Sequence, residues 1–199
     1  MLFDKLPARP SPNSPAGLKY ENKRLKQENK DLKNQALIDS LTGLYNRRYL
    51  NQQLENLAQS GNVKGITALM FDVDNFGDFN NELDKIHGKE KGHFLGDQVL
   101  IKLASILDEN TQATDLVARF GGDEFVAIFP NITDMDSIQH LVYRIHDAME
   151  EGLTKNNIHV SFGFATTVKE DPTKPQSFLP TLQEADRHLL EMKKYKNIL

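Results

Sequence analysis

The sequence has no cysteine among its 199 residues. Disulfide bonds, thiolate nucleophiles and zinc–thiolate sites are therefore excluded. Long hydrophobic runs are also missing, since the longest, residues 66–71, is far shorter than the roughly 20 residues that a membrane-spanning helix needs. The N-terminus lacks the hydrophobic core of a signal peptide. We therefore expect a cytoplasmic protein without a membrane partner.

An excess of positive charge is missing as well. The chain has 24 Lys and Arg residues against 28 Asp and Glu residues, a net charge of −4. This balance argues against a protein that binds nucleic acid through a broad basic surface. Any phosphate-bearing ligand must then be held by a few local residues. The length allows one domain and an appendage, but little more.

Proline gathers at the N-terminal end of the chain. Four of the eight prolines, Pro7, Pro10, Pro12 and Pro15, lie in residues 1–17. Such a composition favours neither a helix nor a packed core, so it predicts a flexible tail. The alternative is a docking peptide for a protein partner.

A heptad pattern follows over residues 18–38. Leu18, Leu25 and Leu32 are spaced seven residues apart, and neither proline nor glycine interrupts them. With these leucines at d, the a positions are Asn22, Asn29 and Ala36, the g positions are Glu21, Glu28 and Gln35, and the e positions are Lys19, Lys26 and Lys33.

This pattern predicts a short parallel coiled coil that joins two copies of the chain. The g and e positions carry opposite charges, and asparagine at a favours a two-stranded register at a cost in stability. The alternative is a single solvated helix whose leucine stripe docks on the domain.

The remaining residues, 39–199, alternate between helix-like and strand-like patterns. This order predicts an α+β sandwich in which helices cover a central, mostly antiparallel sheet. The expected helices are 46–59, 96–109, 134–151 and 178–194, and the expected strands are 65–71, 115–120, 124–129 and 158–167.

Two carboxylates stand at the end of an apolar strand. Asp72 and Asp74 are two residues apart, so in an extended chain both project to one side, with the Val73 carbonyl between them. Oxygen donors of this kind suit a hard cation. Taken alone, the pair is more typical of a helix cap.

A second acidic motif, Gly121, Gly122, Asp123 and Glu124, lies between two apolar segments and indicates a hairpin turn. The glycines let a phosphate approach the backbone, and the adjacent acids repel each other unless a cation relieves them. A solvated turn would explain the glycines but not the acids. If the apolar strands are neighbours, Asp72 joins this group, and the convergent carboxylates predict Mg²⁺ bound to a nucleoside triphosphate.

Together with further motifs in the same order, these residues resemble the GGDEF family of diguanylate cyclases. The motifs are Asp39-Ser-Leu-Thr-Gly-Leu-Tyr-Asn-Arg-Arg48, Phe71-Asp72-Val-Asp74-Asn-Phe76, Asn80, Gly92-His93-Phe-Leu-Gly96-Asp97 and Arg119-Phe-Gly121-Gly122-Asp123-Glu124-Phe125. The resemblance implies a palm-like nucleotidyl cyclase fold. It also implies condensation of two GTP molecules into cyclic di-GMP and pyrophosphate, in a homodimer that meets through the N-terminal helix and the active-site face.

The resemblance assigns metal and catalytic roles. Asp72, the Val73 carbonyl and Asp123 would hold Mg²⁺, with Mn²⁺ as the alternative ion. Glu124 would deprotonate the 3′-hydroxyl or hold a second metal ion. Lys193 matches the family's phosphate-binding lysine near the C-terminus.

It assigns substrate contacts too. Asn80 and Asp97 would read the guanine edge, because a carboxylate accepts hydrogen bonds from donors that adenine lacks there. Gly121 and Gly122 would make room for the base and the phosphates. Phe76 is a further substrate-binding candidate, and its alternative role is in the core.

Four departures from the family pattern keep a second interpretation open, a catalytically silent GTP-binding or signalling module. Gly77 replaces a frequent lysine, and Lys196 is only a partial substitute for a closing arginine. The segment from Asn80 to Gly92 is about eight residues longer than usual, which predicts a displacement of Asp97 relative to Asn80. The Arg-x-x-Asp product site reads Gln112-Ala-Thr-Asp115.

Overall fold

The computed structural model describes residues 14–35, 37–154 and 157–196, without the side chains of residues 27–35. The chain divides into two compact units, Met1–Leu37 and Ile38–Leu199.

The first unit contains helix α1 (Pro15–Gln35). It begins three residues before the predicted start at Leu18, because Ser14 caps it: the Ser14 Oγ accepts a hydrogen bond from the Gly17 N–H at 3.0 Å. Pro15 suits the first helical position, where no N–H is needed. The predicted tail thus ends earlier than residue 17, and its residues 1–13 lie outside the described part of the chain.

The leucine stripe of α1 is visible at two positions. Leu18 is 56% exposed and Leu25 is 43% exposed. Within the helix, Arg24 pairs with Glu21 at 2.7 Å. The remaining heptad positions, Glu28, Asn29, Leu32, Lys33, Gln35 and Ala36, have side chains outside the described residues. The coiled coil stays a prediction.

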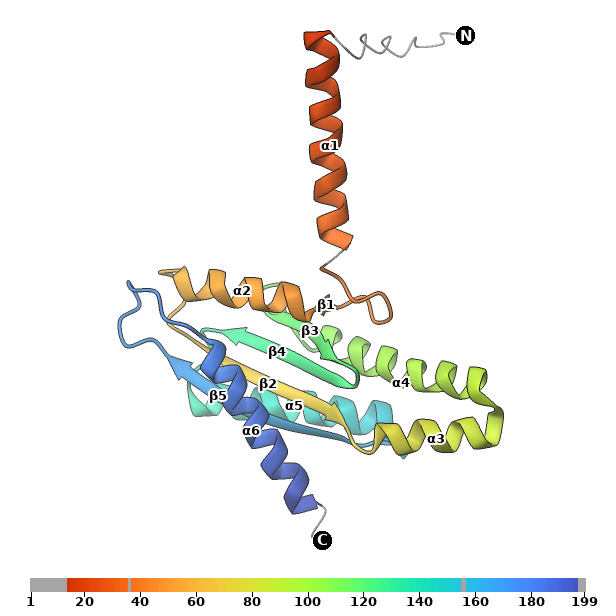
Figure 1. Cartoon of the computed structure of the whole chain (residues 1–199). Helices are drawn as coiled ribbons and strands as arrows, with labels where there is room; N and C mark the ends of the chain where they lie inside the picture. Colours follow the sequence, from red (N-terminus) through yellow and green to blue (C-terminus); the bar gives the residue numbers. More distant parts are fainter. Residues whose placement is uncertain (1–13, 36, 155–156, 197–199) are drawn as a thin grey trace, which may run out of the picture. The chain divides into compact units, whose positions relative to one another are not determined.

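The second unit is built on a five-stranded sheet of order β1-β3-β4-β2-β5 (Figure 1). Three of its strand pairs are antiparallel, and β1 runs parallel to β3. The predicted, mostly antiparallel sheet is confirmed. The strands are β1 (Tyr45–Asn46), β2 (Gly65–Val73), β3 (Leu116–Gly121), β4 (Glu124–Pro130) and β5 (Val160–Val168).

Helices cover both faces of this sheet, which confirms the predicted sandwich. On β2 the side chains alternate: Ile66, Ala68 and Met70 enter one core with α2 and α6, and Leu69 and Phe71 enter the other with α4 and α5. None of the described helices is long and apolar enough to cross a membrane. The helices are α2 (Arg47–Gln59), α3 (Phe76–His87), α4 (Lys89–Glu109), α5 (Met135–Leu153) and α6 (Leu179–Lys196).

Helix α3 and the first turns of α4 differ from the prediction, which had no helix between residues 71 and 96. Helix α3 has no fully buried residue, although Phe76, Phe79, Leu83 and Ile86 recur on it at helical spacing. The first turn of α4, from Lys89, is polar. Both segments are stabilised by packing on each other, side by side beyond the end of the sheet (Figure 1).

Candidate active site

The two acidic motifs meet at one edge of the sheet. Strands β2 and β4 are antiparallel neighbours, and their register places Asp72 opposite Glu124. Asp123 lies in the turn between β3 and β4. We expected these acids to converge only if the two apolar strands were neighbours. The pairing of β2 with β4 confirms that they are.

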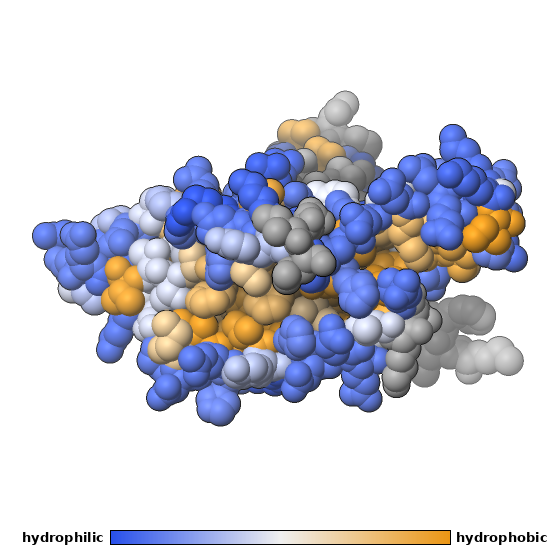
Figure 2. Space-filling model, turned by 90° about the horizontal axis from the view of Figure 1, so that it is seen from below, coloured by the Kyte–Doolittle hydropathy of each residue, from blue (hydrophilic) through white to orange (hydrophobic). Residues whose placement is uncertain are grey.

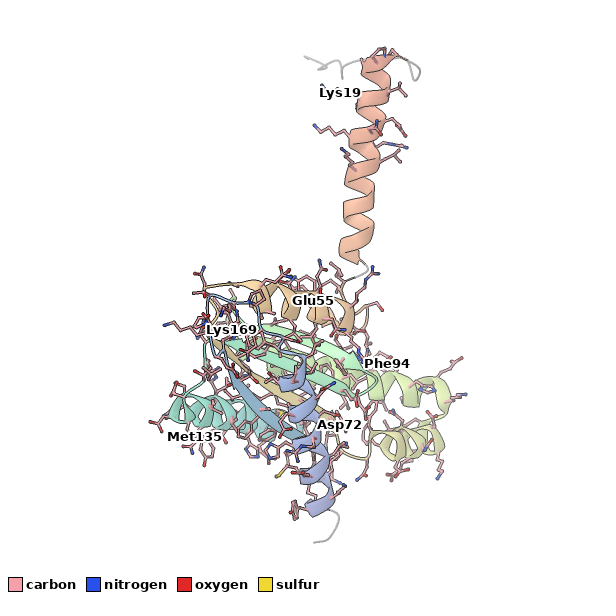
Figure 3. The ribbon with its side chains drawn as sticks, turned by 60° about the vertical axis from the view of Figure 1, so that its left-hand side comes forward. Lys19, Glu55, Asp72, Phe94, Met135 and Lys169 are labelled. Atoms are coloured by element: carbon pink, nitrogen blue, oxygen red, sulfur yellow. The ribbon has the colours of Figure 1, made fainter. Side chains whose placement is uncertain are left out.

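Helix α6 brings two lysines to the acids of β2. Asp72 continues the series of β2 residues that face α6, beside which it lies in Figure 3, and it forms an ion pair with Lys193. One turn later, the Lys196 Nζ lies 2.7 Å from the Asp74 Oδ2. The Ser161 Oγ donates to the Asp74 Oδ1 at 2.6 Å. Nothing in the sequence indicated the role of Ser161, which comes from the neighbouring strand β5.

Two carboxyl groups of the site, those of Asp72 and Glu124, have a raised pKa. Burial raises the pKa of Asp72; the ion pair with Lys193 opposes this, and the negative charge of Asp123 adds to it. Burial likewise raises the pKa of Glu124, with further contributions from the charges of Asp72, Asp123 and Asp186. Asp186, on α6, is an acid of this neighbourhood that the motifs did not single out. A site with such a surplus of negative charge attracts cations.

The donor set fits Mg²⁺ in its chemistry. In the described part of the chain, no three or more His, Cys, Asp or Glu side chains form a group that could hold a metal ion by themselves. Mg²⁺ does not need one, because it is usually bound by one or two carboxylates and takes its other ligands from water and phosphate oxygens. Asp72 and Asp123 can supply that share.

A cavity of about 350 Å³ lies beside the acids. Its walls include Asp74, Asn75, His159, Lys193 and Lys196. Two ammonium groups and an imidazole in one wall suit a phosphate group. Sequence reasoning singled out the lysines but not His159, whose position at the start of β5 becomes significant only when β5 pairs with β2.

Arg119 binds the turn between β3 and β4. Its Nε and Nη2 donate to the Gly122 carbonyl at 2.9 and 2.7 Å, and its Nη1 donates to Asp39 at 3.1 Å. Burial favours the neutral form of Asp39, but hydrogen bonds from Thr42 and Arg119 outweigh it and lower the pKa of this carboxyl. Through Arg119, the motif that begins at Asp39 is connected by hydrogen bonds to Gly122 of the turn.

The predicted base-reading residues lie on α3 and α4. Asn80 lies on α3 against Gly96 of α4, so closely that a Cβ on Gly96 would overlap the Asn80 Oδ1. The backbone just before Asp97 is therefore in contact with Asn80, and the longer segment between them forms the end of α3 and the start of α4. Phe76 packs partly buried against the core and lies 6.4 Å from Phe79 between ring centroids, consistent with its alternative role.

Comparisons with known proteins agree with these motifs. The response regulator PleD of Caulobacter vibrioides is 34% identical over 157 residues, which are 75% of this chain and 33% of PleD. The diguanylate cyclase DgcS of Shewanella oneidensis is 32% identical over 130 residues, 64% of this chain and 38% of DgcS. The chain thus spans about a third of the length of these relatives.

The fold has solved counterparts. The coiled coil and GGDEF domain of DgcB from Caulobacter crescentus, determined in complex with c-di-GMP, superposes with a TM-score of 0.70 at 25% identity. The match covers 90% of this chain and 92% of that one. The profile of the family described as "Diguanylate cyclase, GGDEF domain" matches residues 36–197. With the paired acids at the sheet edge, this match establishes that the chain belongs to the GGDEF family of diguanylate cyclases.

Proposed function

We propose that this protein condenses two GTP molecules into cyclic di-GMP and two pyrophosphates, in a homodimer whose two active-site faces each present one GTP. The observation that carries the proposal is the register that sets Asp72 opposite Glu124, with Asp123 in the adjoining turn. Each domain offers one such site, so a product made of two GMP units requires two domains to face each other.

In the proposed reaction, the 3′-oxygen of one GTP attacks the α-phosphorus of the facing GTP. A bond from the 3′-oxygen to phosphorus forms, the bond from the α-phosphorus to the bridging oxygen breaks, and pyrophosphate leaves. Glu124, which lies opposite Asp72 in the register of β2 with β4, takes the proton of the 3′-hydroxyl or holds a second metal ion. A second, equivalent condensation closes the ring.

Asp72, the Val73 carbonyl and Asp123 would hold Mg²⁺ or Mn²⁺. A bound cation supplies charge that neutralises the phosphate oxygens as negative charge develops on them. Gly122 would leave the turn open to the phosphates, since nothing lies within 4 Å of the position of a Cβ there.

Lys193 and Lys196 would bind the phosphates next to this cation. Lys193 now pairs with Asp72 of β2 and Lys196 with Asp74, just after that strand. Phosphate oxygens can replace Asp72 at Lys193 when this acid binds the metal ion. Lys196 would partly replace the closing arginine of the family pattern. Asn80 and Asp97 would choose guanine over adenine.

The direct test is incubation of the purified chain with GTP and Mg²⁺, followed by chromatography of the products. We expect cyclic di-GMP and pyrophosphate in a ratio of one to two. Asp123→Ala and Glu124→Ala should each reduce the rate by about a hundredfold or more without loss of the fold, because both residues lie at a turn. Near-normal rates in both variants would contradict the assignment.

The second candidate function is a GTP-binding module without catalysis. It is favoured by Gly77, which removes a phosphate charge, and by the pairing of Lys193 and Lys196 with acids. This candidate predicts that GTP binds, measured by calorimetry, and that chromatography finds no cyclic di-GMP. Base specificity is then measured by the affinities for GTP and ATP. Asp97→Ser should weaken the preference for GTP whether the protein is a cyclase or a silent binding module.

A further inference from the structure

Helices α3 and α4 form a hairpin with an unusual symmetry. They join at Gly88, whose positive φ of 83° suits glycine. Asn80 and Gly96 contact each other, and each is eight residues from Gly88; Asp84 and Gly92 contact each other, and each is four residues from it. The hairpin thus repeats one contact between a polar side chain of α3 and a glycine of α4.

The contacts leave no room for a side chain on α4. A Cβ on Gly92 would lie 2.7 Å from the Asp84 backbone nitrogen and 2.9 Å from its Cα, and one on Gly96 would overlap the Asn80 Oδ1. Real Cβ atoms do not approach other atoms so closely. Gly92 therefore sets the distance between the helices at Asp84, whereas Gly96 faces only the side chain of Asn80.

Two side-chain oxygens are trapped by this approach. Among the described residues, the buried side-chain polar atoms without a hydrogen-bond partner are the Asn80 Oδ1 and the Asp84 Oδ1. Buried polar atoms without a partner are rare and call for an explanation. Each oxygen lies where a Cβ on the facing glycine would stand, so a side chain at Gly92 or Gly96 would displace it.

The symmetry also accounts for the longer segment between Asn80 and Gly92. Four extra residues in each helix add about one turn, roughly 6 Å, to each arm. Because both arms grow equally, the pairing of Asn80 with Gly96 is kept while the turn moves outwards. Ile86, next to that turn, is exposed, and Figure 2 shows hydrophobic surface at this end of the molecule.

We propose that Gly96 is a positioning residue for base recognition, and that the extra residues are a spacer that leaves Asn80 and Asp97 in place. The inference rests on the proposed function, because it takes Asn80 and Asp97 as the residues that bind guanine. Gly96 acts through Asn80 by letting α4 lie against its amide. It touches no substrate itself.

A double-mutant cycle tests the role of Gly96. Affinities for GTP and ATP are measured for the full chain, for Gly96→Ala, for Asn80→Ala and for the double variant. Gly96→Ala should weaken GTP binding about tenfold and leave ATP binding within twofold, because the amide must move. In the Asn80→Ala background the same change should cost less than twofold, since no amide remains to displace.

Gly92→Ala is the matched control, because it perturbs the same helix pair one turn away. It should lower Tm at least as much as Gly96→Ala and keep the preference for GTP. Equal costs of Gly96→Ala in both backgrounds, or an unchanged preference for GTP, would overturn the inference alone. A wild-type chain that does not prefer GTP would overturn the proposed function, and this inference with it.

The spacer is tested by excision. Deleting residues 84–87 together with 89–92 keeps Gly88 as the turn and leaves Asn80 and Gly96 four residues from it on either side. This variant should keep the preference for GTP within about threefold. Deleting 89–92 alone shifts one helix by about a turn against the other and should abolish the preference. If both deletion variants melt cooperatively and lose the preference for GTP to a similar extent, the extra residues are not a spacer.

Discussion

Arg119 binds Asp39 and the Gly122 carbonyl at the same time, through different nitrogens of one guanidinium group. Asp39 lies two residues after the end of the N-terminal unit, and Gly122 lies next to Asp123 in the catalytic turn. A planar group with donors on both edges can hold two partners in fixed directions. The guanidinium therefore couples the entry of the domain to the position of the turn.

Arg119→Lys tests this coupling. Lysine keeps the charge but cannot hold both partners, so the turn should lose its fixed position. We expect the rate of cyclic di-GMP formation to fall about tenfold or more, while GTP binding changes less than about threefold. Arg48→Lys, an exposed arginine at the start of α2, is the matched control and should leave both values unchanged. A parallel loss of binding and rate would instead indicate general damage to the site.

The acid cluster predicts a pH-dependent cost in stability. The pKa of Glu124 is raised on folding, mainly by burial and by the charge of Asp72. The folded state therefore binds its proton more tightly than the unfolded chain, and stability rises as pH falls towards 4.5, the ordinary value. Glu124→Gln should thus raise Tm by about 1–2 °C at neutral pH.

The gain from Glu124→Gln should shrink as the pH approaches 4.5, where the native carboxyl becomes protonated. Thermal melts of both proteins without GTP or metal ions, over a pH series, measure the difference. A gain that stays constant with pH would show that charge is not its cause.

Product inhibition should be weak. Gln112 stands where the family's product site has arginine, and the Asp115 Oδ2 already accepts a hydrogen bond from the Gln112 backbone N–H at 2.9 Å. Without the arginine, the charge-assisted contacts to the product phosphates cannot form. We expect half-inhibition only above about 10 μM cyclic di-GMP, and Gln112→Arg should lower that concentration. Sub-micromolar inhibition of the wild-type chain would contradict this prediction.

The heptad segment should act as a tether. Removal of residues 1–37 follows the boundary of the second unit and should leave GTP binding nearly unchanged. Specific activity should then rise steeply with protein concentration, because two untethered domains meet only by diffusion. Full specific activity of the truncated chain at nanomolar concentration would rule the tether out.

The exposed Leu18 and Leu25 leave an apolar stripe through which two copies of the heptad segment can associate. Replacing Asn22 by leucine should strengthen association or change its order, because polar a positions limit both. Sedimentation at several concentrations measures the change. Lys23→Gln, on the outer face of the heptad, is the control that should leave association as it is.

Much of the domain was predictable because its signals are local. Strand β2 has a continuous apolar run, and the β3–β4 hairpin has glycines between two apolar segments. The burial of each segment can therefore be predicted from its own residues. The order of motifs around Asp72 and Asp123 identified the family without any structure. The N-cap of α5, Asp134, also lies at the predicted start of its helix.

Only the tertiary structure decided how segments that are distant in the sequence pack and pair with each other. Helix α3 buries no residue completely, although its apolar residues recur at helical spacing, and it packs against α4 at Gly92 and Gly96. The pairing of Asp72 with Glu124 and with Lys193 depends on the register of β2 with β4 and on the packing of α6. Local periodicity reports whether a segment buries a face, whereas register and side-chain pairing are set by the partner that covers it.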